Sequence, residues 1–524
     1  MARLVVLETM VAGVLVFCCG CGGSDSSGSG SSATPSWTAG VFPPSSTFEA
    51  RCASPRTGTD PATGRAYPDR AGSTVTENSW LRSWTHDLYL WYREVPDLDP
   101  ASYSSTADYF DLLKTSATTP SGHPKDKFHF TYPTTEWEQL SQSGVEAGYG
   151  VTWLVVRARA PRLVVVAYTE PGSPARRPPA KLVRGAQVVT VDGVDLVNAT
   201  DSASVDRLNA GLYPSQEGDR HTFGILDPGA TTPRRVTMVS ANVASTPVQR
   251  VRTIDVGGET VGYMLFNDHI ATAEKGLVTA FDDLAAANVS DLVLDIRYNG
   301  GGYLDIASEV AYMIAGPGPT AGKTFERTVF NDQHPNRDPV TGAVLTPIPF
   351  HSTSQGFSVT EGQALPTLGL SRVVVLTSTN TCSASESIIN SLRGVGVHVI
   401  LVGTTTCGKP YGFYPTDNCG TTYFSINFQG VNARGFGGYP DGFSPANAVG
   451  RVGVAVAGCS VADDFRHDLG DPAEGQLSAA LGYLADRRCP TPVGASARAN
   501  ARAAAEGDGR VHASPLRENR ILRW

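Results

Sequence analysis

The sequence predicts an α/β core that is preceded by a β-rich unit and by a helical segment. Strand-like and helix-like runs alternate between about residues 250 and 490, which is the pattern of an α/β core. Residues from about 143 to 243 instead carry short β-branched runs and turns. Aromatic residues recur at helical spacing from Asn78 onward. A chain of 524 residues is too long for one compact core, so we expect about three domains.

The helical segment is indicated by apolar residues that fall on one helix face. Trp80, Trp84, Leu88 and Trp91 follow one another at spacings of four, four and three. Pro96 is expected to stop this helix. A second helix is expected from Ala107 to Lys114. We interpret the aromatic side chains as core packing rather than as a ligand cage.

The β-rich unit and the α/β core are marked by runs of apolar residues. In the β-rich unit, Leu163 to Ala167 and Gln187 to Val191 are predicted strands, and Asp192-Gly193 is a tight-turn signal. The core has predicted strands at Asp291 to Ile296, Val373 to Thr377 and Val397 to Val402, and predicted helices at Leu304 to Ile314 and Ser385 to Leu392. Residues 316–366 are too long for a simple connection, and we expect an insertion over the site.

Charge and composition exclude some classes of function. The net charge is -8 and no basic stripe is present, which argues against nucleic acid as a partner. The six cysteines beyond the N-terminal signal form no C-x-x-C pair and the histidines show no clustered spacing, so we expect neither a metal nor a cofactor.

The first residues indicate export. Arg3 is followed by a short apolar run, Val11 to Phe17, which is too short to span a bilayer. The run ends in Cys18-Cys19-Gly20-Cys21 and a Ser/Gly stretch, which resembles a bacterial lipoprotein cleavage site. The resemblance implies lipidation of Cys21 and a location on the periplasmic side of a bacterial membrane, held there by the lipid. A plain cleaved secretory peptide is the alternative.

The remaining six cysteines are even in number, which in an exported chain indicates disulfides. They are Cys52, Cys382, Cys407, Cys419, Cys459 and Cys489. Fifteen pairings are possible. We expect a Cys407–Cys419 bridge, because these two close a short loop rich in Gly and Pro.

Ser383 is the first candidate for chemistry. A strand is predicted to end before it, and Ser383-Ala384-Ser385-Glu386 opens a helix. Unpaired backbone donors and the positive end of the helix dipole stabilise negative charge at such a place. The alternative is an ordinary capping box formed by Ser383 and Glu386.

Lys409 is the second candidate. It lies in the glycine loop Gly408-Lys409-Pro410 that follows the strand predicted at Val397 to Val402. If this strand runs parallel beside the preceding one, its C-terminal loop comes near Ser383. Desolvation lowers the pKa of a lysine toward neutrality, which a general base requires.

A glycine run forms the third element. Between a predicted strand and a predicted helix lies the run Arg297-Tyr298-Asn299-Gly300-Gly301-Gly302. This run offers backbone N–H groups to an anion. The run lacks the Gly-Lys-Ser/Thr of a nucleotide P-loop, which disfavours phosphate binding.

Together, the three elements resemble the C-terminal processing peptidases, also called tail-specific proteases, with their "R.N.GG" loop, "SASE" helix start and "GK" loop. The resemblance covers roughly residues 75–490. It implies a crotonase-like α/β protease core in which Ser383 is the nucleophile and Lys409, 26 positions later, is the general base. It implies an oxyanion hole formed by the backbone N–H of Ala384 and of Gly301 or Gly302. Ser385 is the rival nucleophile.

The sequence departs from this family at one position. Many relatives place a Gln four residues after the Lys to orient it, whereas Phe413 stands here. The resemblance therefore names no third catalytic residue. His269 and His398 are interpreted as structural or surface groups.

The β-rich unit resembles the PDZ domains of bacterial proteases. The resemblance is carried by Gly148-Tyr149-Gly150-Val151, by Pro171-Gly172-Ser173-Pro174-Ala175 and by residues 182–193. It implies a β-rich PDZ domain whose 148–151 loop binds the carboxylate of a peptide C-terminus. A PDZ fold that serves only as a spacer is the alternative.

The expected organisation is therefore a signal peptide at 1–21, a disordered tether at 22–48, a helical domain at 49–142, a PDZ-like domain at 143–243, a protease core at 249–490 and a disordered tail at 491–524. The expected activity is that of an exported serine endopeptidase acting on protein or peptide substrates. The alternative is an inactive peptide-binding protein on a protease fold. A penicillin-recognising hydrolase needs S-x-x-K, and none of the seven Lys has a Ser three residues before it.

Overall fold

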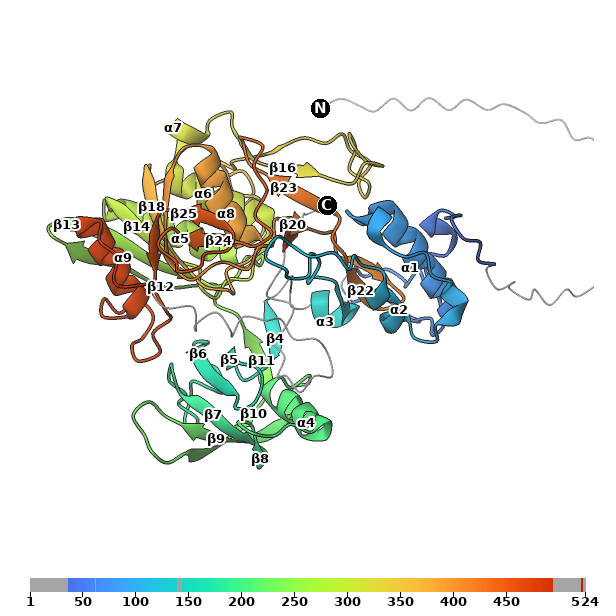
Figure 1. Ribbon diagram of the computed structural model, residues 1–524, viewed down its shortest axis with the longest axis horizontal. Coiled ribbons are helices and arrows are strands. Elements are labelled where there is room, and N and C mark those ends of the chain that lie inside the picture. Colours follow the sequence, from blue (N-terminus) through green and yellow to red (C-terminus); the bar gives the residue numbers. More distant parts are fainter. Residues whose placement is uncertain (1–35, 62, 139–140, 142–143, 493–519, 522–524) are drawn as a thin grey trace, which may run out of the picture.

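A six-stranded central sheet carries the segments that hold the three motifs (Figure 1). The computed structural model describes residues 36–492, except 62, 139–140 and 142–143, together with 520–521. The strand order is β12-β13-β14-β18-β19-β26, and only the edge pair β12–β13 is antiparallel. These strands are β12 (Val248–Val256), β13 (Glu259–Phe266), β14 (Asp291–Asp295), β18 (Arg372–Thr377), β19 (His398–Gly403) and β26 (Gly458–Ser460).

Helices cover both faces of the central sheet, which explains why its strands are apolar throughout. In β18, Val373 and Val375 pack with α5, α6 and α8, whereas Val374 and Leu376 pack with α9. Strand side chains alternate between faces, so both sets must be apolar. The four helices are α5 (Ala273–Ala286), α6 (Leu304–Ala315), α8 (Ala384–Gly394) and α9 (Gly475–Asp486).

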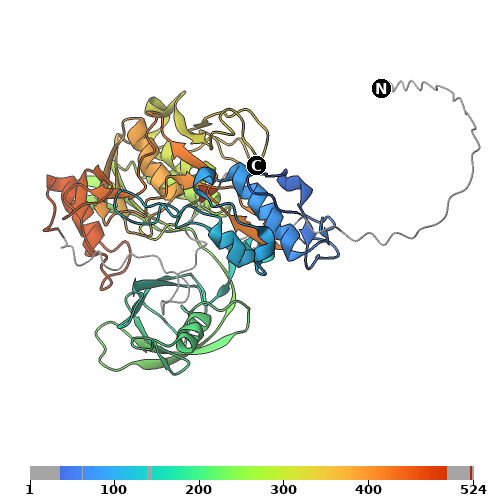
Figure 2. The same cartoon turned by 45° about the vertical axis from the view of Figure 1, so that its right-hand side comes forward.

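The β-rich unit (β4 to β11, residues 145–244) lies below the central sheet in both Figure 1 and Figure 2. Its main sheet has the order β10-β9-β7-β6-β5, and β4 pairs with β11. Its elements are β4 (Val145–Gly148), β5 (Val151–Arg157), β6 (Leu163–Thr169), β7 (Gln187–Val191), β8 (Val194–Asp195), α4 (Ser202–Leu212), β9 (Arg220–Leu226), β10 (Arg234–Val239) and β11 (Ala241–Ala244). The strand predicted at Gln187 to Val191 is confirmed as β7.

The N-terminal segment packs its aromatic residues as predicted. Trp80, Trp84 and Leu88 lie in α1 and are buried together. The helix ends at Leu88, earlier than Pro96, and Trp91 packs beyond it against Tyr411 at 4.7 Å between ring centroids. This segment contains η1 (Ser45–Thr47), β1 (Arg51–Cys52), β2 (Arg70–Ala71), α1 (Thr74–Leu88), η2 (Tyr92–Glu94), η3 (Pro100–Ser102), α2 (Thr106–Leu112), β3 (Phe130–Pro133) and α3 (Thr134–Glu138).

Smaller sheets surround the ends of the central strands. One has the order β17-β16-β23-β20 and another the order β21-β22-β3. The 316–366 segment contributes β16 to the first of these. The remaining elements are β15 (Gly302–Tyr303), α7 (Pro317–Thr320), β16 (Thr324–Val329), β17 (Ile348–Pro349), β20 (Tyr411–Gly412), β21 (Thr416–Asn418), β22 (Thr421–Phe424), β23 (Phe428–Val431), β24 (Phe443–Pro445), β25 (Val454–Val456) and β27 (Arg520–Ile521).

Three disulfides are present among the described residues, and the predicted Cys407–Cys419 pairing is wrong. The bridges are Cys52–Cys419, Cys382–Cys407 and Cys459–Cys489. Cys407 follows β19 and Cys382 follows β18, and these strands are parallel neighbours, so their C-terminal loops meet. The pairing of these cysteines therefore follows from the adjacency of the strands that precede them, and not from the shortest separation in the sequence.

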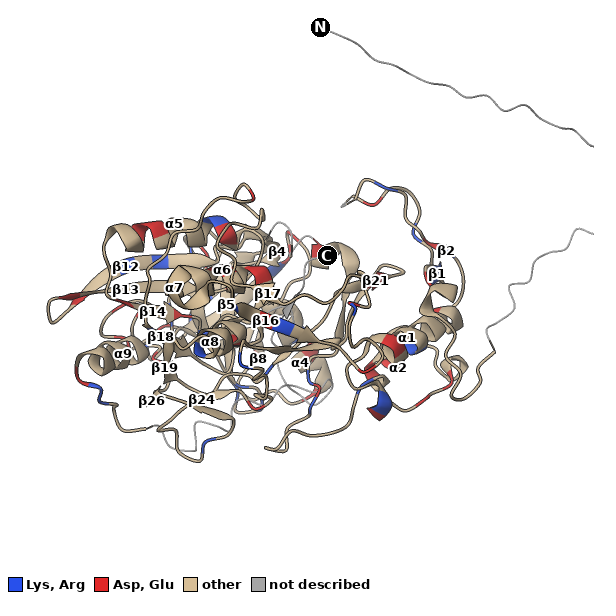
Figure 3. Ribbon diagram, turned by 90° about the horizontal axis from the view of Figure 1, so that it is seen from above, with Lys and Arg blue, Asp and Glu red and all other residues tan. Residues whose placement is uncertain are grey.

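Two general properties of the described residues are the distribution of their charges and the hydropathy of their helices. Acidic and basic residues are interspersed along the ribbon (Figure 3). No helix among the described residues is long and apolar enough to cross a membrane. Cys21 lies outside the described residues.

Candidate active site

Three loops meet at one edge of the central sheet, where β14, β18 and β19 end. These strands are parallel neighbours, so their carboxyl ends lie at the same edge. The loop after β14 holds Asn299 and the glycine run. The loop after β18 leads to Ser383, and the loop after β19 leads to Lys409.

Ser383 lies at the start of α8 in a strained backbone conformation. Its φ is 59° and its ψ is -116°, a region that non-glycine residues rarely adopt. Its side chain is fully buried, and its Oγ has no hydrogen-bond partner within the described part of the chain. Strain of this kind costs about 1–3 kcal/mol and clusters at functional sites.

Glu386 joins the serine loop to the lysine loop through one buried carboxylate. Its Oε2 accepts hydrogen bonds from the backbone N–H of Ser383 at 3.0 Å and of Lys409 at 2.8 Å. Its Oε1 accepts from Gly408 N–H at 2.9 Å and from the Thr406 hydroxyl. Burial raises the pKa of Glu386, and these hydrogen bonds act in the opposite direction. The capping interaction expected from the sequence therefore also fixes the second loop.

Lys409 is fully buried between two aromatic rings. Its Nζ lies 4.6 Å from the ring centroid of Phe128 and 4.5 Å from that of Phe413. Phe413 is the residue that stands where the family resemblance expects Gln. The amine is thus surrounded by apolar rings on two sides, in a place that excludes water.

Gly408, next to Lys409, has no room for a side chain. Its φ is +83°, and a Cβ would lie 2.3 Å from the carbonyl oxygen of Pro440. The glycine that the "GK" pattern requires is therefore explained by a close approach of two backbones.

The glycine loop is tied to the Ser383 helix through Asn299. The backbone carbonyl of Asn299 accepts hydrogen bonds from Ser385 Oγ at 3.0 Å and from Cys382 N–H at 3.1 Å. Its Oδ1 accepts from Gly301 N–H at 3.0 Å and lies 2.9 Å from His269 Nδ1. The hydroxyl of Ser385, the rival nucleophile, is therefore engaged by the loop.

His269 is buried beside the glycine loop and is neutral at physiological pH. Burial lowers the pKa of His269 to about 3. Gly302 has a φ of +135°, and a Cβ there would lie 2.5 Å from the His269 carbonyl oxygen. The close packing of these two backbones demands glycine at position 302.

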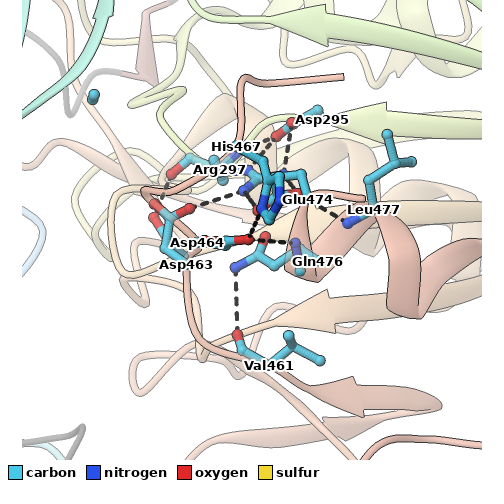
Figure 4. Close-up of polar contacts among 12 residues, drawn as sticks. Asp295, Arg297, Val461, Asp463, Asp464, His467, Glu474, Gln476 and Leu477 are labelled. Atoms are coloured by element: carbon cyan, nitrogen blue, oxygen red, sulfur yellow. Dashed lines mark hydrogen bonds and ion pairs between the residues drawn. The ribbon is translucent and has the colours of Figure 1, made fainter. Parts of the chain in front are cut away.

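A buried ion cluster anchors the start of the glycine loop (Figure 4). Arg297 is fully buried and binds Asp295 with Nε and Nη2, at 3.0 Å each. It also binds Glu474 with Nη1 at 2.7 Å and Nη2 at 3.0 Å, and Asp463 at 2.9 Å. Glu474 caps α9, so the cluster joins the end of β14 to that helix.

The same cluster connects the β-rich unit to the core. Arg184 of the β-rich unit donates to Tyr298 Oη at 2.7 Å and to Asp463 Oδ1 at 2.5 Å. Tyr298 immediately follows Arg297 and precedes the glycine run. The β-rich unit is therefore in direct contact with the loop at the edge of the sheet.

A short strand from the far end of the chain pairs at this site. β27 runs parallel to β15, with Gly302 opposite Arg520 and Tyr303 opposite Ile521. β27 also lies close to β20, which begins two residues after Lys409. A peptide backbone in extended conformation therefore fits beside the glycine loop.

The structure brings together most of the residues predicted for the site. Ser383, Ala384, Gly301, Gly302 and Lys409 all lie on the three loops. The Gly148-Tyr149-Gly150-Val151 loop lies in the β-rich unit, between β4 and β5. Cys382, Glu386 and Cys407 have ligand atoms close enough to hold a metal, but both cysteines are committed to a disulfide.

Two side chains at the site had no predicted role: that of Arg297, which lies in the predicted glycine run, and that of Cys382. A charged residue directly after an apolar strand is a signal for Arg297, because a buried charge needs partners. The signal for Cys382 was its position next to Ser383, matched by Cys407 two residues before Lys409.

Family models match the part of the chain that contains these loops. The model of peptidase family S41 matches residues 260–413, and that of the peptidase S41 N-terminal domain matches residues 76–132. The family resemblance predicted from the three motifs is confirmed.

Individual relatives agree with the family models. A carboxyl-terminal-processing protease of Picosynechococcus is 25% identical over 46% of this chain and 49% of its own length. The chloroplastic carboxyl-terminal-processing peptidase 1 of Arabidopsis thaliana is 29% identical over 44% of this chain and 41% of its own length. The matches thus span about half the length of these curated relatives.

One solved structure supports the fold. An S41 protease from Bacteroides fragilis matches 80% of this chain and 98% of its own, with a TM-score of 0.57 and 23% identity. This match shows that the chain has the mixed α/β fold of that protein.

Proposed function

We propose that this chain is a serine endopeptidase acting on protein substrates, because residues 260–413 match the model of peptidase family S41 and residues 76–132 match that of its N-terminal domain. Ser383 is the proposed nucleophile and Lys409 the proposed general base. The observation that carries the proposal is that one oxygen of Glu386 binds the backbones of both residues. The dyad residues are buried at the same edge of the sheet.

In the proposed reaction, the neutral amine of Lys409 takes the proton of Ser383 Oγ as the oxygen attacks the scissile carbonyl carbon. The C–N bond then breaks, and the lysine returns a proton to the leaving amine. This step leaves an ester between Ser383 and the acyl half of the substrate. Water, deprotonated by the same amine, hydrolyses the ester and regenerates the serine.

The proposed oxyanion donors are the backbone N–H groups of Ala384 and Gly302. Ala384 is the first residue of α8, where helical N–H groups lack intrahelical partners. Gly301 N–H already donates to Asn299 Oδ1. Between the two glycines that the family resemblance left open, we therefore favour Gly302.

The substrate is proposed to bind as an added strand along β15. The pairing of β27 with β15 supports this, because it places an extended backbone beside Gly302. Strand addition recognises the main chain and leaves side-chain preference to the surrounding pockets.

The β-rich unit is proposed to be a PDZ domain that captures free C-termini of substrates through residues 148–151. Two features of the loop support this proposal. Gly150 has a φ of +66°, and Tyr149 is buried with its hydroxyl donating to Gly211 O at 3.1 Å, so the loop is held in a turned conformation. The core is likewise proposed to be crotonase-like, on the basis of its parallel strands and glycine loop.

The chain is proposed to act outside the cytoplasm, anchored by lipid at Cys21. The three disulfides support this location, since disulfides persist in oxidising compartments. Palmitate labelling of the expressed full chain, compared with a Cys21→Ala variant, tests the anchor.

The catalytic proposal is tested with Ser383→Ala, Lys409→Ala and Lys409→Arg, assayed on casein and on a quenched peptide. All three should lose at least about 1,000-fold in kcat, because the dyad acts as one unit and guanidinium does not deprotonate. Ser385→Ala is the matched control and should keep most of the activity. A folded Lys409→Ala variant with near wild-type turnover would exclude the dyad.

A further inference from the structure

The Cys382–Cys407 disulfide joins the two loops that carry the proposed dyad. Cys382 immediately precedes Ser383, and Cys407 precedes Lys409 by two residues. The Cα atoms of the two cysteines are 5.1 Å apart. Cys382 is fully buried, and Cys407 is partly buried. The bridge therefore ties the nucleophile loop covalently to the base loop.

Hydrogen bonds to one carboxylate also help to hold the backbone around Lys409. Glu386 binds the N–H groups of Gly408 and Lys409. A further backbone bond runs from Cys407 N–H to Thr381 O at 3.0 Å. The aromatic rings of Phe128 and Phe413 enclose the amine. The disulfide adds a covalent link next to both Ser383 and Lys409.

We propose that the Cys382–Cys407 disulfide is a positioning element of the active site, which holds the Lys409 loop against the Ser383 loop. The inference rests on the proposed Ser/Lys function. Reduction by a dithiol would transfer two electrons and two protons to the bridge, giving two thiols and an oxidised dithiol. The base loop would then lose its covalent link to the Ser383 loop and would be held by hydrogen bonds, among them those to Glu386 and to Thr381 O. A displacement of about 1 Å at reacting atoms costs on the order of 100-fold in rate.

The test compares two double variants of the full chain, Cys382→Ala/Cys407→Ala and the control Cys459→Ala/Cys489→Ala. The control bridge has a similar sequence separation, 30 against 25, and joins β26 to the segment after α9, away from the dyad. The readouts are kcat and KM on a quenched peptide and the rate at which a fluorophosphonate labels Ser383. Thermal unfolding checks that each variant is folded.

Removing the 382–407 bridge should lower kcat and the labelling rate about 10–100-fold, with KM within about twofold of wild type. The control should keep the wild-type kcat. Adding a dithiol should lower the wild-type and control rates to that of Cys382→Ala/Cys407→Ala and leave the latter unchanged. A folded Cys382→Ala/Cys407→Ala variant that is labelled at the wild-type rate would overturn the inference.

Amide hydrogen exchange separates this inference from the proposed function. Loss of the bridge should accelerate exchange in residues 381–386 and 404–410, and the control should accelerate exchange only near its own cysteines. If wild type shows no hydrolysis and no labelling, the proposed function fails, and the exchange data still decide whether the bridge holds the two loops together. Unchanged exchange in both segments would refute the positioning role whatever the activity.

Discussion

Ser383 and Glu386 share one helical turn, and together they explain how a short motif organises the site. Ser383 adopts a positive φ, which turns the chain sharply into α8. Glu386, three residues later, binds the Ser383 N–H and reaches across to Lys409 N–H. A carboxylate is needed here because both of its oxygens accept hydrogen bonds, from four donors in all.

Glu386→Gln should destabilise the protein and lower kcat. One oxygen of the pair becomes an NH₂ group, which cannot accept, so two buried donors lose their partner at about 1–3 kcal/mol each. Urea unfolding and peptide hydrolysis are the measurements. Asp282→Asn, at an exposed site on α5, is the matched control and should change neither value. Equal stability of Glu386→Gln and wild type would contradict this account.

At the scale of elements, β27 and the 316–366 segment are two parts of the chain that pack beside the elements of the core. β27 pairs with β15 beside the glycine loop, where a substrate strand is proposed to bind. The 316–366 segment is held to α5 by Glu274, whose carboxylate accepts four backbone N–H bonds from Gln355, Gly356, Ser358 and Val359. Backbone pairing holds β27, whereas the 316–366 segment is held both by amide–carboxylate bonds and by apolar side chains that enter the main core, such as Phe325 and Phe350.

A chain that ends at residue 492 should bind substrate more tightly than the full chain. Residues 520–521 form β27 and pair with the edge of β15, so their removal frees that edge for an added substrate strand. We expect KM to fall severalfold with kcat unchanged. A synthetic peptide of residues 515–524 should inhibit the shortened chain competitively, whereas a scrambled peptide should not. An unchanged KM in the shortened chain would disprove the idea that β27 competes with substrate for the edge of β15.

The free energy of unfolding should decrease as pH rises because of Glu309, which lies in α6 against Glu274. Burial and the neighbouring Glu274 raise the pKa of Glu309 from 4.5 to about 9. Between these values the folded state binds a proton that the unfolded state has released, so the free energy of unfolding falls as pH rises from about 4.5 to about 9.

Glu309→Gln should flatten this pH dependence, because an amide stays neutral. Urea unfolding at pH 5, 7 and 8.5 measures the slope, which for one group reaches at most about 1.4 kcal/mol per pH unit. Glu361→Gln, at an exposed site in the same region, should keep the wild-type slope. The same slope in wild type and Glu309→Gln would refute the assignment.

At the scale of the whole molecule, the β-rich unit shares buried structure with the core. Ala167 and Tyr168 of β6 pack in the same apolar cluster as the α9 face of the central sheet. Arg184 reaches Tyr298, one residue after Arg297 and directly before Asn299. The unit is thus joined to the glycine loop by both apolar packing and hydrogen bonds.

If the β-rich unit recruits substrates by their carboxylate, free-acid and amidated versions of one peptide should differ in KM. Loss of hydrogen bonds to a charged group is worth about 1.5–3 kcal/mol, which is about tenfold or more in KM. Gly150→Ala should abolish this difference, since a Cβ there would lie 2.3 Å from Ser173 Cβ. Equal rates for both peptides would exclude carboxylate recognition.

The sequence by itself determined the local elements and the resemblance to a known family. The strand at Gln187 to Val191 and the helix beginning at Leu304 followed from residue type and period, which act over a few residues. The spacing of Ser383, Lys409 and the glycine run predicted a resemblance to a peptidase family, and the model of peptidase family S41 matches residues 260–413.

Only the tertiary structure decided how distant segments are paired. Cys407 bonds to Cys382 rather than to Cys419, because adjacent parallel strands bring their loops together whatever the sequence separation. The partners of Arg297 and the second role of Glu386 likewise depend on loops that meet at one sheet edge. Burial then makes these contacts obligatory, since a charge or a polar group removed from water must find a partner in the fold.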